Sequence, residues 1–202
     1  THEPLDPVRY LSNPSSGKMG YAVAEKAKAR GAEVVLISGP TNLTPPVGIK
    51  FESCKTAAEM NSLVQKHFPE CDVLLMSAAV GDFTAEKLEK EKIKKQGEEV
   101  RTLKLVATKD ILMEASKIKT RQFVVGFAAE TQNLIESALE KLRKKKLDLI
   151  VANDISAPGI GFQSDNNQVT LIGSDEKIEN LPRMTKKEIA NILLDRISCA
   201  KH

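Results

Sequence analysis

The chain of 202 residues has no tryptophan, and aromatic residues make up only 4% of it. This scarcity argues against a protein that binds single-stranded nucleic acid by stacking bases on aromatic side chains. No apolar run approaches the roughly 20 residues that a membrane helix needs, and no signal peptide is recognisable. The net charge of +3 is too small to identify a partner by itself.

Cysteine and histidine are also scarce. Cys54, Cys71 and Cys199 have neither metal-ligand nor redox spacing, so we expect structural thiols in a reducing cytoplasm. The three histidines are scattered, and two of them lie near the chain ends. The sequence therefore predicts no metal site built from these residues and no covalent catalysis by a Cys/His pair.

What the chain does contain is typical of a globular domain, with 41% hydrophobic and 28% charged residues. Its length suits one domain or at most two small ones. Because residue 1 is threonine, we expect the chain to be processed or excised from a longer protein.

Helical and strand patterns alternate along the chain. The amphipathic segments predict helices over 17–30, 56–68, 110–118, 130–145 and 185–197. Short apolar or alternating runs predict strands over 33–37, 49–52, 72–76, 101–106, 122–126 and 147–151, and a hairpin over 169–172 and 177–181. This order predicts a doubly wound α/β fold with a mainly parallel sheet covered on both faces.

Ligands of such sheets bind at the carboxyl ends of the strands. This rule points to residues 77–82, 127–130 and 153–154. Small residues in the first of these segments let a ligand approach the backbone, and Asp82 is placed to accept hydrogen bonds from ribose hydroxyls. The alternative is a tight exit from the strand in which Asp82 is only a turn residue.

The segment from Ser12 to Gly20 opens the first helix with small residues. Backbone amides at a helix start bind anions, and the helix dipole favours negative charge there. The alternative is an ordinary helix cap provided by Ser15 or Ser16. The segment matches neither the Walker pattern nor the Gly-x-Gly-x-x-Gly pattern.

Basic residues gather in two further segments. The run from Lys90 to Lys95 is either a solvated face or a flap over a polyanionic substrate. Residues 141–146 hold five basic side chains, of which Lys141 and Lys145 share one helical face and fit a polyphosphate. Favourable contact with the helix dipole and binding of duplex DNA are the alternatives. Thr108 is a candidate cap for the helix that follows it, and the free amides of this helix start fit a triphosphate equally well.

Together these segments, in this order, resemble the bacterial phosphopantothenate–cysteine ligase domain. The resemblance rests on residues 3–10, 12–13, 15–20, 78–80, 92–95, 125–131, 152–154 and 161–167. Each motif is weak alone, but these eight motifs in the correct order over nearly the whole chain are specific.

The resemblance implies a Rossmann-like fold, with a small antiparallel extension used for homodimerisation. It implies that 4′-phosphopantothenate, L-cysteine and CTP react, with Mg²⁺, to give phosphopantothenoylcysteine, CMP and pyrophosphate through an acyl-cytidylate. It also implies one ligase domain over 1–202 that lacks the family's first strand, and native fusion to a flavin-dependent decarboxylase domain that is absent here. No nucleic acid or membrane partner is expected.

The same resemblance implies roles for individual residues. Asn13 would contact the acyl group and Lys92 would lie on a flap that closes over the site, both in catalytic roles. The phosphate region would be lined by Ser15, Ser16, Gly17 and Lys18. The nucleotide and intermediate would meet Ser77, Ala78, Asp82, Lys109, Asp110, Ile111, Leu112, Phe127, Lys141 and Lys145. Metal ligands are not identified.

Pro14 departs from the family, where a non-proline residue is more common, and it favours an extended backbone at Asn13. Two other classes of function compete with the ligase. One is a nicotinamide-dependent oxidoreductase, which would require Gly-x-Gly-x-x-Gly after its first strand. The other is a nucleic-acid-binding module that uses residues 141–146.

Overall fold

The computed structural model describes residues 1–95, 97, 100–130, 132–154 and 164–201. The motif residues Thr131, Gly161 and Phe162 lie outside this part of the chain. Within the described part, no helix is both long and apolar enough to cross a membrane.

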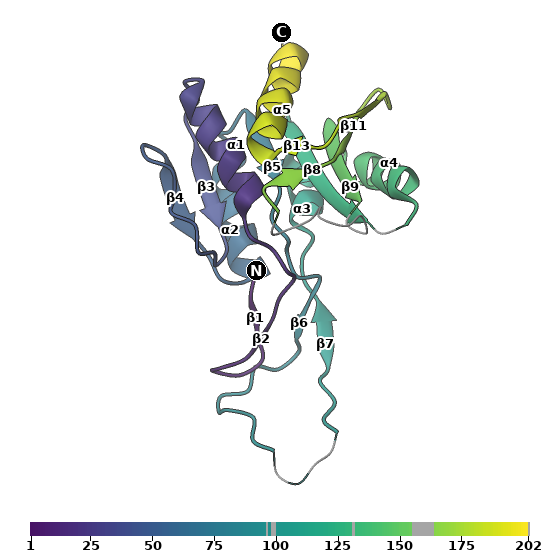
Figure 1. Cartoon of the computed structure of the whole chain (residues 1–202). Helices are drawn as coiled ribbons and strands as arrows, with labels where there is room; N and C mark the ends of the chain where they lie inside the picture. Colours follow the sequence, from purple (N-terminus) through teal and green to yellow (C-terminus); the bar gives the residue numbers. More distant parts are fainter. Residues whose placement is uncertain (96, 98–99, 131, 155–163, 202) are drawn as a thin grey trace.

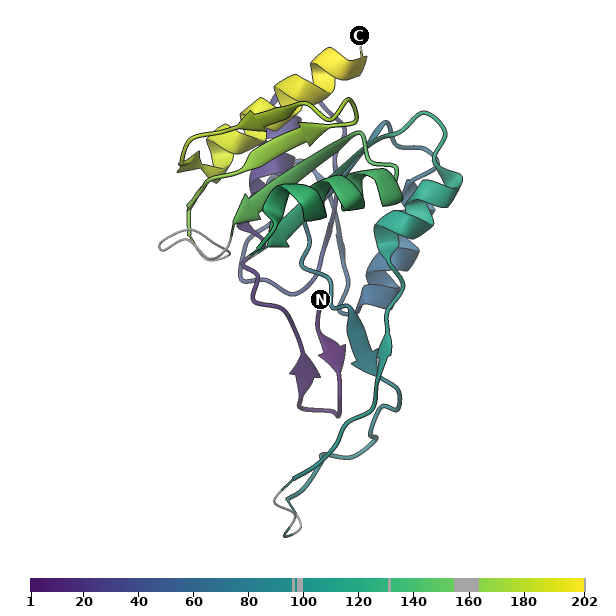
Figure 2. The same ribbon diagram turned by 90° about the vertical axis from the view of Figure 1, so that its right-hand side faces the viewer.

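A five-stranded sheet forms the centre of the molecule, in the order β12-β11-β9-β8-β5 (Figure 2). The strands β5 (Val73–Met76), β8 (Phe123–Glu130) and β9 (Leu149–Asp154) run parallel. They are extended by the antiparallel strands β11 (Thr170–Gly173) and β12 (Ile178–Asn180). The prediction of an α/β fold with a mainly parallel central sheet is confirmed.

Helices cover both faces of this sheet (Figure 1). Buried residues of α1 (Lys18–Ala29) and α5 (Lys186–Lys201) pack against one set of strand residues, which includes Val125. Residues of α3 (Ile111–Ile118) and α4 (Leu134–Lys144) pack against the alternate set, which includes Val124. The near-continuous apolar strands follow from this two-sided burial.

A second, smaller sheet contains only the parallel strands β3 (Val35–Ser38) and β4 (Lys50–Ser53). Strand β3 packs against α2 (Ala57–His67), which also contacts α3. A cavity of about 720 Å³ lies between β3 and β5, with α1 and α2 contributing to its walls. Among the described strands, none of the second sheet is hydrogen-bonded to a strand of the central sheet.

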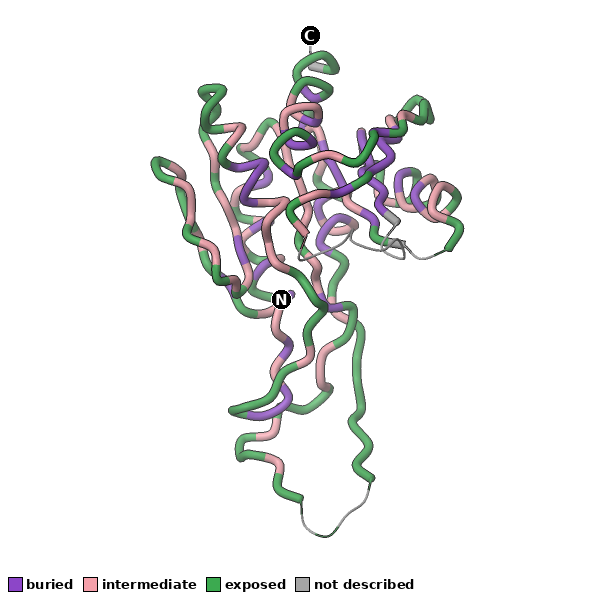
Figure 3. The backbone as a smooth tube through the Cα atoms, viewed as in Figure 1, coloured by how far each residue is buried: buried purple, intermediate pink, exposed green. Residues whose placement is uncertain are grey.

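Two antiparallel strand pairs form an arm that projects from the body (Figures 1 and 2). One pair is β1 (Glu3–Pro4) with β2 (Tyr10–Leu11), and the other is β6 (Phe83–Ala85) with β7 (Leu105–Ala107). Exposed residues dominate the arm in Figure 3. A further short pair, β10 (Asn166–Asn167) with β13 (Met184–Thr185), precedes α5.

Several predicted boundaries were wrong. Strand β8 continues to Glu130, so the helix expected over 130–145 begins only at Leu134, after Asn133 in a left-handed conformation. The strand expected over 101–106 is confined to β7, and it pairs with β6 in a charged segment where no strand was expected. Tertiary pairing decides both cases, because the local patterns are weak there.

Asp6 anchors the arm, although it is an acidic side chain with no exposed surface. Its carboxylate accepts hydrogen bonds from the backbone amides of Val8 and Arg9, each at 2.8 Å, and from that of Ile93 at 3.0 Å. It also pairs with the Arg9 guanidinium at 2.6 Å. Burial alone would raise the pKa of Asp6, but these donors outweigh it and hold the pKa at about 2.

We therefore expect the arm to lose order in acid. The pKa of Asp6 lies below its ordinary value of about 4, so its stabilising effect is complete above that pH and disappears as the pH falls towards 2. Hydrogen–deuterium exchange at the Ile93 amide should accelerate, relative to an unstructured peptide, over this range. Asp6→Asn should exchange faster than the wild-type protein near neutral pH and lack the transition; an unchanged profile in the variant would contradict the assignment.

Candidate active site

A cleft of about 530 Å³ opens at the carboxyl ends of β5 and β8. This volume is in the range of small-molecule sites. The structure brings almost all the predicted site residues to this one cleft. Its walls contain Asn13, Ser15, Ser16, Gly17, Lys18, Ser77, Ala78, Asp82, Lys109, Asp110, Ile111, Leu112, Phe127, Lys141 and Lys145.

The start of α1 forms one wall. Gly17 occupies the cap position with φ of 73°, a left-handed conformation that glycine adopts without steric cost. Gly17 itself provides no side-chain cap, but the Ser15 hydroxyl accepts from the Gly17 amide at 3.4 Å and the Ser16 hydroxyl accepts from the Lys18 amide at 3.5 Å, so the alternative of a serine at the helix start has support in the structure. The first turn also has no acidic residue. The start of α1 thus brings backbone amides, serine hydroxyls and no acidic side chain to the cleft wall, a combination that suits an anion.

In the same wall, the backbone of α1 lies close to a side chain at the end of β5. A Cβ atom at Gly20 would lie 2.9 Å from the hydroxyl oxygen of Ser77, which follows β5. Glycine at this position lets the first turn of α1 lie directly beside the strand end. The two predicted phosphate and nucleotide segments consequently share one surface.

The loop after β5 is held by hydrogen bonds from both sides. The Asn13 side-chain amide donates to the Val80 carbonyl at 3.0 Å. The Thr108 hydroxyl donates to the Gly81 carbonyl at 2.6 Å, and the Thr108 backbone amide donates to the Asp82 carbonyl at 2.9 Å. Only one of the two N–H donors of Asn13 is used in this contact, and the side chain is exposed to the cleft.

Another wall carries cations from the end of α4, namely Lys141 in its last turn and Lys145 directly after it. Lys145 pairs with Asp110 at 2.8 Å, and Asp110 caps α3 by accepting from the Met113 amide at 3.1 Å. The predicted cap at Thr108 was therefore wrong, because Asp110 caps the helix while the Thr108 side chain supports the loop. Burial raises the pKa of Asp110, but the hydrogen bonds from Lys145 and from backbone amides lower it by more. The net pKa is therefore below its ordinary value, and the carboxyl group stays ionised.

Lys92 does not line this cleft. It lies on the arm, next to Ile93, whose carbonyl accepts from Arg9 at 2.9 Å and whose amide donates to Asp6. The side chain of Lys92 is exposed. Its catalytic role remains a prediction that needs movement of the arm or a second copy of the chain.

Sequence reasoning missed Lys186 and Asn167, both buried and both in the cleft wall. Lys186 is the first residue of α5. A lysine in the first helical turn is disfavoured by the helix dipole, and this signal was available from the sequence. Asn153, also in the wall, lies in a strand end that the sequence did indicate.

The described residues contain no group of three or more His, Cys, Asp or Glu side chains that could hold a metal by themselves. Mg²⁺ needs less, because it binds through one or two carboxylates, water and substrate phosphates. Asp82 and Asp110 supply carboxylates to the cleft. The donor set therefore fits a metal that arrives with a nucleotide.

The fold and the cleft define a doubly wound α/β protein whose cleft, at the carboxyl ends of its parallel strands, is lined by lysines and a helix start. Residues 1–200 match the family described as the DNA/pantothenate metabolism flavoprotein C-terminal domain, and the chain belongs to this family. The resemblance drawn from the sequence motifs is thereby confirmed.

Two similar relatives are bacterial proteins of coenzyme A biosynthesis. Coenzyme A biosynthesis bifunctional protein CoaBC of Escherichia coli (strain K12) is 46% identical over 202 residues, covering 98% of this chain and 49% of the relative. The Bacillus subtilis (strain 168) protein of the same name is 45% identical over 199 residues, with the same shares. The chain thus spans about half the length of these relatives.

A crystal structure of the C-terminal domain of CoaBC has the same fold, with a TM-score of 0.84 and 39% sequence identity. The match covers 99% of this chain and 90% of that chain.

Proposed function

We propose that this domain ligates 4′-phosphopantothenate with L-cysteine in a CTP-dependent reaction of coenzyme A biosynthesis. The observation that carries the proposal is the convergence of the α1 start, two strand ends and the lysines at the end of α4 on one cleft. The chain covers 49% of the length of the two CoaBC relatives. We therefore also propose that this domain is natively fused to a flavin-dependent decarboxylase domain.

The reaction has two steps. First, the substrate carboxylate attacks the α-phosphorus of CTP, which forms an acyl-cytidylate and breaks the bond to the leaving pyrophosphate. Second, the cysteine amine attacks the acyl carbon, which forms the amide, releases CMP and leaves one proton for solvent. Both nucleophiles are substrates, so no side chain needs to be a nucleophile.

Charge is the main obstacle, because an anion attacks an anion. We propose that Lys141, Lys145 and the amides of the first turn of α1 offset the charge of the triphosphate. Asp82, exposed at the cleft, would hold Mg²⁺ together with the phosphates. The metal, when bound, would polarise the phosphoryl oxygens and neutralise the leaving pyrophosphate.

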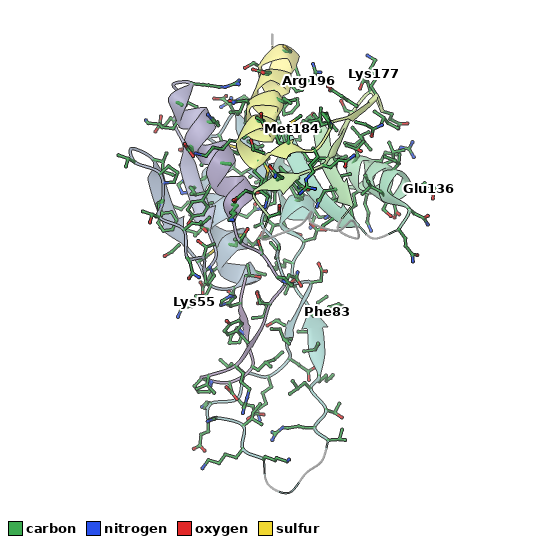
Figure 4. The ribbon with its side chains drawn as sticks, viewed as in Figure 1. Lys55, Phe83, Glu136, Lys177, Met184 and Arg196 are labelled. Carbon is green, nitrogen blue, oxygen red and sulfur yellow. The ribbon has the colours of Figure 1, made fainter. Side chains whose placement is uncertain are left out.

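We further propose a homodimer formed through the arm. Phe83, labelled on the arm in Figure 4, is 54% exposed, and Leu105 is 42% exposed. Strand β7 pairs with β6 on one edge, and a free strand edge with apolar side chains favours pairing with another chain.

The dimer is tested by light scattering at micromolar concentration. The expected mass is twice the 22.1 kDa of one chain. Leu105→Asp should shift the protein to monomer, whereas Ile178→Asp, at an exposed position on the distant strand β12, should not. A monomeric wild-type protein would contradict the proposal.

The ligase proposal itself is tested by pyrophosphate release. Release should require both CTP and 4′-phosphopantothenate, and cysteine should make it catalytic. ATP, NADH and duplex DNA serve as comparison ligands. Stabilisation by NADH instead of CTP would favour an oxidoreductase, and salt-sensitive DNA binding without pyrophosphate release would favour a nucleic-acid-binding module.

A further inference from the structure

Two lysines open two neighbouring helices beside the cleft. Lys18 is the first residue of α1, Lys186 is the first residue of α5, and both lie in the cleft wall. The two helices pack against each other over the same face of the sheet. Met184, labelled in Figure 4, lies two residues before Lys186 and marks this corner of the molecule. Positive charge is thus concentrated at one end of the cleft.

Lys186 is buried to an extent that is unusual for a lysine. The residue is only 6% exposed, and its ammonium group donates to the Ser164 carbonyl at 2.6 Å. Burial lowers its pKa, the Lys18 ammonium lowers it further, and Asp165 raises it. Burying a charge is unfavourable unless an opposite charge compensates it, so a negative group is expected at this position.

Asp165 supplies that negative charge in the structure. Its carboxylate pairs with the Lys18 ammonium at 2.7 Å, and its side chain is 84% exposed. The Lys18 hydrogen bond lowers the pKa of Asp165, so the carboxyl group is an anion at neutral pH. An exposed ion pair contributes little to stability, and exchange of this carboxylate for another anion therefore costs little.

We propose that Lys18 and Lys186 form a phosphate-binding pair that Asp165 occupies until a substrate phosphate displaces it. This assignment rests on the proposed function, because it takes the phosphate to be that of CTP or of 4′-phosphopantothenate. The lysines at the other wall are Lys141, in the last turn of α4, and Lys145, the residue that follows α4. The cleft accordingly has two separate cationic regions for two phosphorylated substrates.

Isothermal titration of three ligands tests the role of Lys186. The ligands are CTP, 4′-phosphopantothenate and pantothenate, which lacks the phosphate. Lys186→Met should weaken the ligand whose phosphate uses the pair by about tenfold to a hundredfold, and should leave pantothenate unchanged. Lys187→Met is the matched control, since Lys187 is the next residue, is exposed and pairs with Glu25 at 3.0 Å.

The Asp165→Asn variant is expected to change the affinity for the phosphorylated ligand in the opposite direction to Lys186→Met. Removing the competing carboxylate should tighten the same phosphorylated ligand by about threefold to tenfold, whereas loss of a purely structural ion pair would weaken binding or leave it unchanged. Asp175→Asn is the control, because Asp175 also pairs with an exposed lysine, Lys177, on the β11–β12 turn. Asp165 is exposed, so this test holds even if Lys186→Met fails to fold.

The outcomes separate this inference from the proposed function. Opposite shifts at Lys186 and Asp165 for one phosphorylated ligand support the pair and identify which substrate uses it. Wild-type affinities in both variants, or equal weakening of pantothenate by Lys186→Met, overturn the pair and leave the ligase proposal intact. If the wild-type protein binds neither phosphorylated substrate, both proposals fail.

Discussion

Asn13→Asp is expected to release pyrophosphate once per site from CTP and 4′-phosphopantothenate and then to stall. The Asn13 side chain lies in the cleft, and the Val80 carbonyl positions it through one of its two N–H donors. The second donor is then available to the acyl oxygen, which gains negative charge when cysteine attacks. A carboxylate at this position would repel that charge, whereas the first step builds its charge at phosphorus.

Loss of one such donor commonly reduces the rate by 100-fold or more, and we expect about this loss in the cysteine-dependent step. A single-turnover pyrophosphate burst measures the first step, and mass spectrometry detects the retained acyl-cytidylate. Asn13→Ala, which removes the donor without adding charge, should stall in the same way but less completely. A variant that binds CTP normally without a burst would assign Asn13 to the first step; wild-type turnover would make it a structural residue before Pro14.

Lys92→Ala is expected to slow acyl-cytidylate formation by on the order of a hundredfold, because a cation would be lost from the transferring phosphoryl group. The fold should remain intact, since Lys92 is exposed. Lys90→Ala is the matched control, an exposed lysine on the same segment. Equal pyrophosphate release in the two variants would show that Lys90–Lys95 is only a solvated face.

The outcome at Lys92 also bears on the arm. Lys92 lies outside the cleft in the single chain, while Asp6 and Arg9 hold the adjacent Ile93. A hundredfold effect would therefore require closure of the arm or contact with the cleft of a second copy. If Leu105→Asp produced a monomer with the same loss of activity, the second copy would be implicated.

Much of the fold was predictable because burial leaves a strong local pattern. The core strands β5 and β9 are nearly continuous apolar runs, and both were expected within a few residues of their observed ends. The arm was not predictable in this way. Strand β6 lies in a charged segment, and its identity depends on pairing with β7, which is 20 residues or more distant in sequence.

In the cleft too, some residues could be predicted from local sequence patterns and others could not. Rules for strand ends and helix starts indicated Ser77, Asp82 and Lys18, since these rules depend on short segments. Asp110 was expected to meet the nucleotide. That it also caps α3 and forms an ion pair with Lys145 appears only in the structure. Lys186 gives only one local signal, a lysine in the first turn of a helix, and its burial, which makes it noteworthy, appears only in the structure.

The most direct test of the ligase account follows oxygen from substrate to product. With both carboxylate oxygens of 4′-phosphopantothenate labelled with ¹⁸O, the reaction with CTP and cysteine should place one ¹⁸O in CMP and retain one in the amide of phosphopantothenoylcysteine. This result is predicted because the carboxylate attacks the α-phosphorus and CMP departs with the bridging oxygen. Label in inorganic phosphate or pyrophosphate, or CMP without label, would contradict an acyl-cytidylate and the central claim with it.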